Sequence, residues 1–471
     1  MVMGSLEQQV DVVVVGSGPG GYVAAMRAAD LGHEVTLVEA RERRGGVCLL
    51  EGCIPSKALI STVELAHAAR DAAKMGLTFK DLEVDHEKLR GFKEKVVAGL
   101  SGGIDFLLKK RGVEVITARA RFDSGDTLFL DGGARIKFNH CILAVGSRPS
   151  RLPPAGELEL WSSTEALELR EIPGRLLVVG GGYIGLELGF VYAGLGSKVS
   201  VVELLPGLLM GADRDLVKFV DRKAKKRFEK VMLGAKVTKV VEAPNGGYRV
   251  SIESDGKVTD HEYDRVLVAV GRRPNTDNIG LENTKIEVDK HGLIQVDQTM
   301  RTAEPRVFAI GDIVPGPGLA HKAMREGKVA AEVINGKPSA ADYVSVPAIV
   351  FTDPEVAWVG LTEDEAKAQG RDVHVGRFPL TALGRAKTID RTDGMSKVIS
   401  DAQTGLVLGV GVVGPHASEL IAEATLALEM GATVEDIAAT IHPHPTLSES
   451  VGEAAEVAEG VAVHIYPPTG M

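Results

Sequence analysis

The two cysteines in residues 45–58, GGVCLLEGCIPSKA, have the residue type and spacing that could support redox chemistry. Four residues separate Cys48 from Cys53. On a regular helix their Cα atoms would lie roughly 8 to 9 Å apart, beyond the roughly 7 Å limit for a disulfide. If the two sulfurs pair, the backbone between them must bend, and Gly52 permits such a bend. We interpret the segment as a redox pair.

The residues that follow favour an ionised thiol at Cys53. Pro55 suits the first turn of a helix that begins just after Cys53. A thiolate at a helix N-terminus is stabilised by the helix dipole, and Lys57 adds a cation one turn on. Two other readings stay open from spacing alone, namely inert buried thiols and half of a zinc site. The third cysteine, Cys141, lies in an apolar run that resembles a buried strand.

Composition limits the possible function classes. The 471 residues suggest about three domains, and 44% apolar with 25% charged residues is typical of a soluble globular protein. The net charge of −10 opposes binding to nucleic acid. The N-terminus MVMGSLEQQ resembles no targeting signal, and no run approaches the roughly 20 apolar residues of a membrane span. With so few cysteines, we predict a cytoplasmic protein without a structural disulfide framework.

A dinucleotide-binding pattern precedes the cysteines. Residues 11–15 form an apolar run typical of a buried parallel strand, followed at once by Gly16, Gly18 and Gly21. The first glycine allows a tight turn, the second admits a pyrophosphate, and the third brings the next helix close to the strand. A second strand ends at Glu39, 23 residues after the first glycine, where its carboxylate can accept ribose hydroxyls.

The same pattern repeats 164 residues later. Gly180, Gly182 and Gly185 match the three glycines, and Glu203 matches the acid. Two such units predict two dinucleotides. No basic residue follows Glu203 before Arg214, which favours NAD over NADP in the second unit. The first unit continues into the cysteine pair, so a flavin bound there would place an electron acceptor beside the sulfurs.

Three further segments end in residues suited to ligand binding. LAVGSRP (143–149) and VAVGRRP (268–274) each predict a strand that ends in a glycine turn. A strand over 306–313 contains Asp312 near its end, which is well placed to hold polyol hydroxyls or to cap the next helix.

The chain beyond about residue 346 changes character. Short alternating segments predict an antiparallel sheet, and 418–430 predicts an apolar helix, which together indicate an α+β domain. Near the end, Pro445 makes His444 extended and can start a helix. Glu449 could then bond one ring nitrogen of His444 and leave the other free as a base, although such a histidine can equally be an ordinary loop residue.

Five motifs together resemble one enzyme family over about Val10 to Tyr466: GGVCLLEGCIPSKAL, GGGYIGLELG, FAIGDI with LAHKAMREG, FTDPEVAWVGLT, and HPHPTLSE. They resemble the pyridine nucleotide-disulfide oxidoreductases. The resemblance implies an α/β fold with two Rossmann-like domains, for FAD and NAD, and a C-terminal α+β interface domain that forms a homodimer. The implied division is 1–150 (first part of the FAD domain), 151–274 (NAD domain), 275–345 (second part of the FAD domain) and 346–471 (interface domain).

The resemblance implies flavin-dependent oxidation of protein-bound dihydrolipoyl groups, with reduction of NAD⁺ to NADH. The expected partner is a lipoyl-bearing carrier protein or acyltransferase of a 2-oxo acid dehydrogenase complex or the glycine cleavage system. A disulfide reductase of the glutathione type that uses NAD(P)H is the alternative, since Tyr183 resembles the tyrosine over the nicotinamide pocket of those enzymes. A nucleotide-sensing protein that lacks the chemistry is a more distant one.

The resemblance also implies roles for individual residues. Cys48 would exchange with substrate and Cys53 would face the flavin as a thiolate, with Glu51 adding a negative charge between them. His444, oriented by Glu449, would reach into the partner subunit's site. No metal site is expected. The residues expected around FAD are Gly16, Gly18, Gly21, Glu39, Lys57 (paired with Glu187), Ala120, Gly146, Ser147, Asp312 and Ala320. Those expected around NAD are Gly180, Gly182, Gly185, Glu187, Glu203, Val237 and Gly271.

Overall fold

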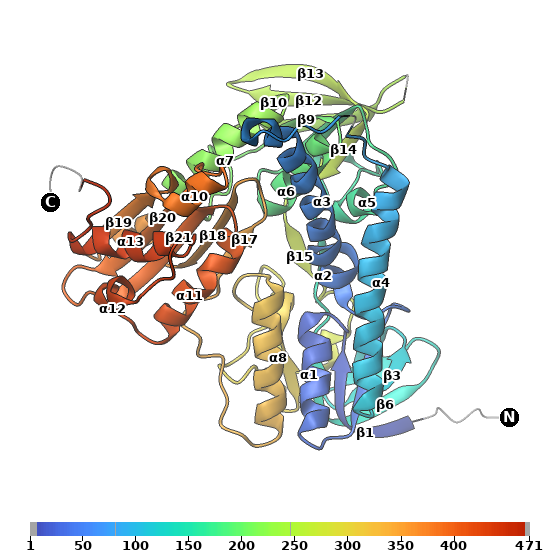
Figure 1. The fold of residues 1–471 in the computed structure, drawn as a ribbon. Coiled ribbons are helices and arrows are strands. Elements are labelled where there is room, and N and C mark those ends of the chain that lie inside the picture. Colours follow the sequence, from blue (N-terminus) through green and yellow to red (C-terminus); the bar gives the residue numbers. More distant parts are fainter. Residues whose placement is uncertain (1–6, 81, 245, 467–471) are drawn as a thin grey trace.

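The first nucleotide unit is built on a seven-stranded sheet in a computed structural model that describes residues 7–466 except 81 and 245. Val12, Val13 and Val14 are fully buried because helices and loops cover both faces of the central strand, as the apolar run predicts. The strand order is β3-β2-β1-β6-β5-β4, with β16 beside β6 (Figure 1). The strands are β1 (Glu7–Val15), β2 (Val35–Glu39), β3 (Glu114–Thr117), β4 (Ala120–Ser124), β5 (Thr127–Leu130), β6 (Arg135–Leu143) and β16 (Val307–Ala309).

Helices α1 and α8 lie side by side against this sheet (Figure 1). They approach closely because their facing residues are small: a Cβ on Gly327 would lie 2.6 Å from the carbonyl oxygen of Gly20. Residues far apart in the sequence therefore complete one unit. The helices of the unit are α1 (Pro19–Asp30), α2 (Gly46–Glu51), α3 (Cys53–Asp71), α4 (His86–Lys110) and α8 (Ala320–Ile334).

The second nucleotide unit has a four-stranded parallel sheet in the order β10-β9-β8-β14, next to an antiparallel sheet in the order β11-β12-β13. A ribbon of β7 and β15 links the two units, pairing the residues that follow the two predicted glycine turns. The elements are β7 (Ser147–Pro149), α5 (Ser163–Glu168), β8 (Arg175–Val179), α6 (Tyr183–Gly194), β9 (Lys198–Val202), α7 (Arg214–Arg227), β10 (Lys230–Met232), β11 (Lys236–Glu242), β12 (Tyr248–Ser254), β13 (Lys257–Tyr263), β14 (Arg265–Val268) and β15 (Arg272–Pro274).

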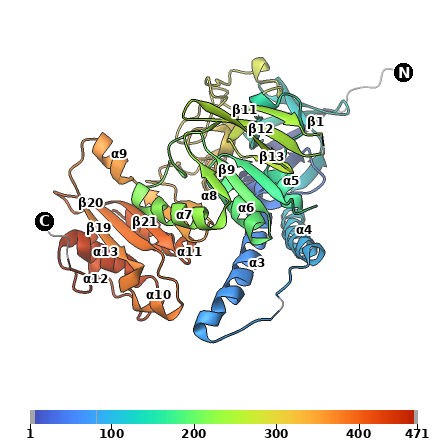
Figure 2. The same cartoon turned by 90° about the horizontal axis from the view of Figure 1, so that it is seen from above.

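The C-terminal part is a five-stranded antiparallel sheet in the order β17-β18-β21-β20-β19, with α11 and α13 packed on it and α12 packed against α13 (Figure 2). The predicted fold class, two Rossmann-like units and an α+β domain, is confirmed. The elements are β17 (Ala348–Val350), β18 (Glu355–Gly360), α9 (Glu363–Ala368), β19 (Val373–Pro379), α10 (Gly384–Thr388), β20 (Met395–Asp401), β21 (Val407–Gly414), α11 (Ala417–Glu429), α12 (Val434–Ala439) and α13 (Glu449–Glu459).

Two sequence predictions misplaced the ends of elements. The strand predicted over 306–313 is only Val307–Ala309, because the chain turns into a short 3-10 helix at Gly311–Ile313. The helix expected to start at Pro445 begins at Glu449, because the intervening residues form a loop around His444. As a result, Asp312 lies in the turn after β16, and His444 lies in the loop before α13.

One helical stretch, Gly46–Met75, is long and apolar enough to cross a membrane by length and composition alone. The stretch contains Glu51, Lys57 and Glu64, so it is not the uninterrupted apolar run that the sequence analysis looked for. The stretch is interrupted at Gly52, and its second part, α3, packs against α4 and α6. Residues 1–6, on which the prediction about targeting signals partly rests, lie outside the described residues.

Candidate active site

The cysteine segment bends between its two thiols, as predicted. Helix α2 ends at Glu51 and α3 begins at Cys53, with Gly52 between them at φ −147° and ψ −112°. This bend brings the two sulfur atoms to 2.6 Å from each other. Cys141 is fully buried in β6, and the described residues contain no cluster of three or more histidine, cysteine or acidic side chains that could hold a metal ion.

The two thiols differ in acidity. The hydrogen bond between the sulfurs and the nearby ammonium of Lys57 lower the pKa of Cys53 to about 7. The same hydrogen bond, together with burial, raises the pKa of Cys48. When the pair is reduced, Cys53 therefore carries the thiolate and Cys48 keeps its proton, in agreement with the prediction that Cys53 ionises more easily.

Lys57 is held by residues from the other two regions of the molecule. Its Nζ lies 2.8 Å from a carboxylate oxygen of Glu187, which α6 of the second unit contributes. Glu187 is buried and also accepts the backbone N–H of Phe351 at 3.0 Å. The ammonium lies 4.4 Å from the centroid of the Phe351 ring. The predicted pair of Lys57 and Glu187 thus joins all three regions beside the thiols.

A cavity of about 780 Å³ lies beside the cysteines. It is large enough for a dinucleotide. Helix α1 points its N-terminus at it, and because Gly18 supplies no side-chain cap, the first N–H groups of the helix are available to a pyrophosphate. The predicted flavin residues that line the cavity are Gly16, Gly18, Glu39, Lys57, Ala120, Gly146, Ser147, Asp312 and Ala320.

Gly21 is the predicted flavin residue that does not line the cavity. A Cβ on Gly21 would lie 1.8 Å from the carbonyl oxygen of Gly16, so only glycine allows α1 to pack this closely on the turn. Its function is the close approach of helix and strand. The donors and acceptors around the cavity therefore fit FAD: helix N–H groups for phosphates, Glu39 for ribose hydroxyls and Asp312 for a polyol.

Sequence reasoning missed the pair that holds the loop carrying Asp312. Lys322 and Glu326 form an ion pair at 2.9 Å, and both side chains are about 1% exposed. Glu326 accepts the N–H of Gly311 at 2.8 Å, and Lys322 donates to the carbonyl of Gly311 at 3.2 Å. The spacing of a lysine and a glutamate one helical turn apart in LAHKAMREG was the available signal.

The second glycine turn repeats the first. The carboxylate of Glu203 accepts the N–H of Gly181 at 2.6 Å, and Gly182 caps α6 without a side-chain bond. Among the residues predicted for NAD, Gly180, Gly182, Gly185 and Glu203 gather at this turn, Gly271 follows β14 and Val237 is buried in β11. Tyr183, in the first turn of α6, lines the cavity of the first unit, and burial raises its pKa to about 12.

His444 and Glu449 form the predicted dyad away from the cysteines of their own chain. Their Nδ1 and Oε1 atoms lie 2.8 Å apart, and Glu449 also accepts the N–H of Thr446 at 2.7 Å. Neither residue lines the cavity, and the His444 side chain is 78% exposed. One chain thus holds an oriented imidazole without bringing it to its own thiols.

Comparisons with known proteins cover nearly the whole chain. Residues 10–327 match the family model described as pyridine nucleotide-disulphide oxidoreductase, and residues 346–455 match the dimerisation domain of that family, which supports a homodimer. A dihydrolipoyl dehydrogenase from Geobacillus stearothermophilus is 47% identical over 469 residues, covering 99% of each chain. One from Vibrio parahaemolyticus is 49% identical over 462 residues, covering 97% of each chain.

A solved structure agrees with these matches. The crystal structure of LpdA from Mycobacterium tuberculosis is similar with a TM-score of 0.86 and 29% identity, covering 95% of this chain and 99% of that one. The chain therefore has the fold, the paired thiols and the two dinucleotide turns, and its sequence matches both the nucleotide-binding part and the dimerisation domain of the family. The chain belongs to the pyridine nucleotide-disulphide oxidoreductases.

Proposed function

We propose that the protein oxidises protein-bound dihydrolipoyl groups to lipoyl disulfide and reduces NAD⁺ to NADH, as a dihydrolipoyl dehydrogenase. The observation that carries this proposal is the pair of sulfurs, 2.6 Å apart, beside a cavity with the shape and donors of a dinucleotide site. The cofactors are FAD and NAD. FAD held by the N-terminus of α1, Glu39 and Asp312 would supply electron transfer from the reduced cysteine pair, which would close to a disulfide again, to NAD⁺, which would take the electron pair as hydride.

The residues of the chain have separate parts in the thiol chemistry. A dihydrolipoyl thiol loses its proton to His444 and attacks Cys48, which breaks the disulfide and releases Cys53 as a thiolate. The second substrate thiol then attacks the first substrate sulfur and displaces Cys48, which takes up the proton of that thiol, so that lipoyl disulfide leaves and two electrons stay on the cysteine pair. Glu449 holds His444 by one ring nitrogen, and Lys57 stabilises the negative charge on Cys53.

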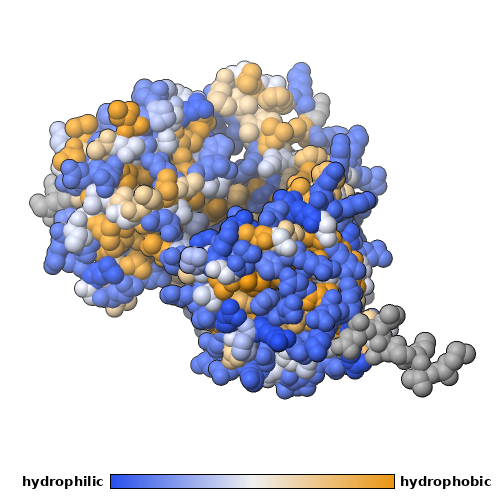
Figure 3. All heavy atoms as spheres, turned by 90° about the horizontal axis from the view of Figure 1, so that it is seen from below, coloured by the Kyte–Doolittle hydropathy of each residue, from blue (hydrophilic) through white to orange (hydrophobic). Residues whose placement is uncertain are grey.

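The proposed active site needs two chains, because His444 and Glu449 lie outside the cavity of their own subunit. The C-terminal part exposes large apolar side chains, which supports a self-association surface there. Figure 3 shows apolar residues gathered on this part of the molecule, and a hollow between it and the nucleotide units. The exposed apolar residues include Leu426, Met430, Ile441, Val461 and Val463.

The partner, the location and the domain boundaries are parts of the same proposal. We propose a lipoyl-bearing carrier protein or acyltransferase of a multienzyme complex as the partner, and the cytoplasm as the compartment. We propose domains at 1–150, 151–274, 275–345 and 346–471. The return of β16 to the first sheet, beside β6, supports assigning the third segment to the FAD domain.

An absorbance spectrum tests the function most directly. The purified protein should be yellow, and dihydrolipoamide should reduce the flavin band and produce a long-wavelength shoulder from a thiolate beside the flavin. Rates with NADH against NADPH, and with lipoamide against glutathione, separate this function from that of a glutathione-type reductase. A colourless protein, or one that prefers glutathione with NADPH, would contradict the proposal.

A further inference from the structure

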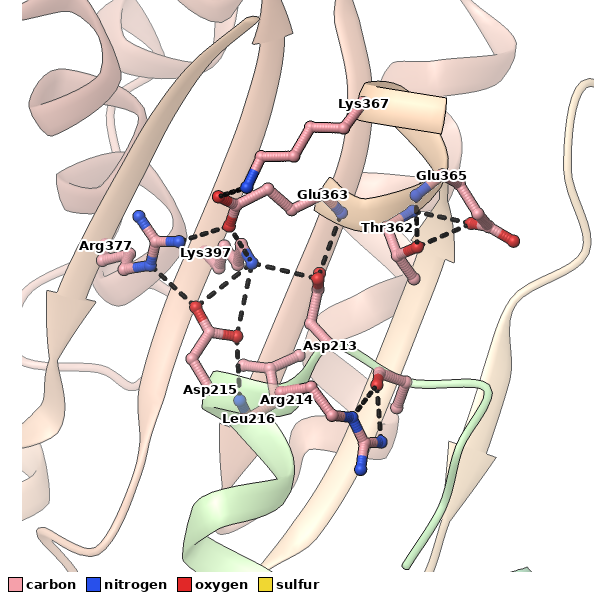
Figure 4. Close-up of polar contacts among 11 residues, drawn as sticks. Asp213, Arg214, Asp215, Leu216, Thr362, Glu363, Glu365, Lys367, Arg377 and Lys397 are labelled. Atoms are coloured by element: carbon pink, nitrogen blue, oxygen red, sulfur yellow. Dashed lines mark hydrogen bonds and ion pairs between the residues drawn. The ribbon is translucent and has the colours of Figure 1, made fainter. Parts of the chain in front are cut away.

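A cluster of five charged residues, centred on a buried lysine, lies outside the active site (Figure 4). Lys397 is 1% exposed, and its Nζ lies 3.1 Å from Asp213, 3.1 Å from Asp215 and 2.9 Å from Glu363. Arg377 pairs with the carboxylates of Asp215, at 2.7 Å, and of Glu363. We call these residues the Lys397 cluster. Removing the buried Lys397 would leave three facing carboxylates without their shared cation, so Lys397 holds them in place.

The Lys397 cluster joins two regions of the molecule. Asp213 and Asp215 flank the first residue of α7 in the second nucleotide unit, whereas the other three belong to the C-terminal sheet and its helix α9. Asp213 also accepts the backbone N–H of Glu363 at 3.0 Å. None of the five lines the cavity or takes part in the proposed thiol chemistry. The contact fixes the start of α7 against the C-terminal sheet.

Arg214, between the two aspartates, connects the start of α7 to the loop that precedes it. Its guanidinium donates to the carbonyl of Leu208 at 2.8 Å and to that of Ala212 at 2.7 Å, and it also bonds the carbonyl of Leu209. A planar group with several donors on one loop fixes the backbone more firmly than a lysine would. The loop 204–212 is therefore tied to the start of α7.

The same loop contacts the second glycine turn. The N–H of Leu209 donates to the carbonyl of Gly181 at 3.1 Å, and the N–H of Leu205 donates to Glu203 at 2.7 Å. Leu208 packs over the turn so closely that a Cβ on Gly181 would lie 2.6 Å from it. A continuous series of polar contacts therefore runs from Lys397 to the residues that would hold the pyrophosphate and ribose of NAD.

We propose that the Lys397 cluster is a positioning device for the NAD site, through which the C-terminal sheet holds loop 204–212 in its binding conformation. The inference rests on the proposed assignment of NAD to the second unit. A loop that is already ordered binds its ligand more tightly, because less conformational entropy is lost on binding. Loosening the cluster should weaken the adenosine side of NAD binding and leave the thiol chemistry unchanged.

The test compares Lys397→Met with Lys93→Met in the flavin-containing protein. Lys93 is a matched control because it is also buried and paired, with Glu94 at 2.9 Å and the carbonyl of Leu167 at 2.7 Å, but lies on α4. Calorimetric titration with ADP-ribose measures binding without hydride transfer. We expect about tenfold weaker binding in Lys397→Met and no change in Lys93→Met.

Steady-state kinetics should also distinguish Lys397→Met from the control. Lys397→Met should raise KM for NAD⁺ about tenfold and leave kcat at saturating NAD⁺ within about twofold of the wild type. Lys397→Arg, which keeps the charge, should restore most of the affinity. If Lys397→Met does not fold, Arg214→Lys and Arg377→Gln test the same series, and each should weaken ADP-ribose binding.

The possible failures differ from one another. If the wild type binds ADP-ribose, and Lys397→Met, Arg214→Lys and Arg377→Gln bind it equally well, the inference is wrong and the proposed function stands. If Lys93→Met loses as much affinity as Lys397→Met, the effect is general destabilisation and the inference is also wrong. If the wild type does not bind ADP-ribose, the assignment of NAD to the second unit fails, and the inference fails with it.

Discussion

The two nucleotide units share one local geometry and differ in what surrounds it. A Cβ on Gly16 would lie 2.4 Å from the carbonyl oxygen of Ala144, and one on Gly180 would lie 2.3 Å from that of Ala269. In each unit a glutamate at the end of the second strand accepts an N–H of the glycine turn, at 2.8 Å in the first and 2.6 Å in the second. The two sequences thus produce nearly the same turn.

The segments that follow the two acids make the units different. In the first, the chain folds back so that a Cβ on Gly46 would lie 2.4 Å from Cα of Gly18, and the cysteine helices close over the turn. In the second, Leu204 and Leu205 remain 63% and 48% exposed. The shared turn can thus bind a dinucleotide in either unit. The segment that follows the acid decides whether that nucleotide is enclosed with the thiols or left free to exchange.

The largest expected effect separates the chemistry of the two units. Cys48→Ser should reduce the rate of dihydrolipoamide oxidation by at least about a thousandfold, because the sulfur that would exchange with substrate is removed. The flavin spectrum and ADP-ribose binding should not change, since neither turn is altered. Stopped-flow reduction by dihydrolipoamide, with calorimetry as the control, measures both. Undiminished oxidation would remove Cys48 from the exchange step.

The next effect concerns His444, the proposed base, which does not line the cavity of its own chain. His444→Gln should lower lipoamide turnover by about a hundred- to ten-thousandfold while flavin remains bound, because positioned proton transfer is lost. Mixing this variant with Cys48→Ser sharpens the test, since a hybrid dimer has one intact site if each site uses two chains. Turnover near the wild-type rate in His444→Gln alone would exclude this base.

A matched pair of glycine variants tests whether the two turns act independently. Both positions have positive φ, 99° at Gly16 and 115° at Gly180, and both Cβ atoms would contact a backbone carbonyl. We expect Gly16→Ala to weaken flavin retention about thirtyfold, from about 2 kcal/mol of strain. Gly180→Ala should keep the flavin and weaken ADP-ribose binding by a similar factor. Loss of both ligands in either variant would show that the units do not bind separately.

The smallest effect concerns the ion pair of Lys57 and Glu187, which joins the two nucleotide units. Lys57→Met leaves the buried Glu187 without its cation, and we expect about 2 kcal/mol lower unfolding free energy, allowing for the partly exposed lysine. The pKa of Cys53 should rise from about 7 toward its usual value, since Lys57 helps to lower it. Thiolate absorbance against pH in the reduced protein, and thermal unfolding, measure the two changes. An unshifted thiol titration would show that Lys57 does not act on Cys53.

The sign of the pH effect follows from the lowered pKa. A thiol with a pKa of about 7 when folded and 9.0 when unfolded stabilises the reduced protein fully above pH 9.0. That contribution is lost as the pH falls through the interval to about 7. The wild type should therefore lose stability across this interval, relative to Lys57→Met, when both are reduced. Equal pH profiles would contradict it.

Patterns local in sequence predicted the fold well. The two βαβ turns depend on glycines and on an acid 23 residues on, and the close contacts of Gly21 with Gly16 and of Gly185 with Gly180 lie within one segment. The bend at Gly52 was likewise predictable, because a helix cannot join thiols at that spacing. The end of the strand at 307–309 and the start of α13 were not, because side chains bond the backbone of the adjoining loops: Glu326 and Lys322 bond Gly311, and Glu449 bonds Thr446.

The sequence by itself determined the two dinucleotide turns and predicted the thiol pair and the dyad of His444 with Glu449, since each is a short-range pattern with its own physical reason. Only the tertiary structure decided that Phe351 joins the pair of Lys57 and Glu187, that Lys322 and Glu326 hold the loop of Asp312, and that the Lys397 cluster joins α7 to the C-terminal sheet. In each case a contact joins different elements of the chain, and only the folded packing brings those elements within reach.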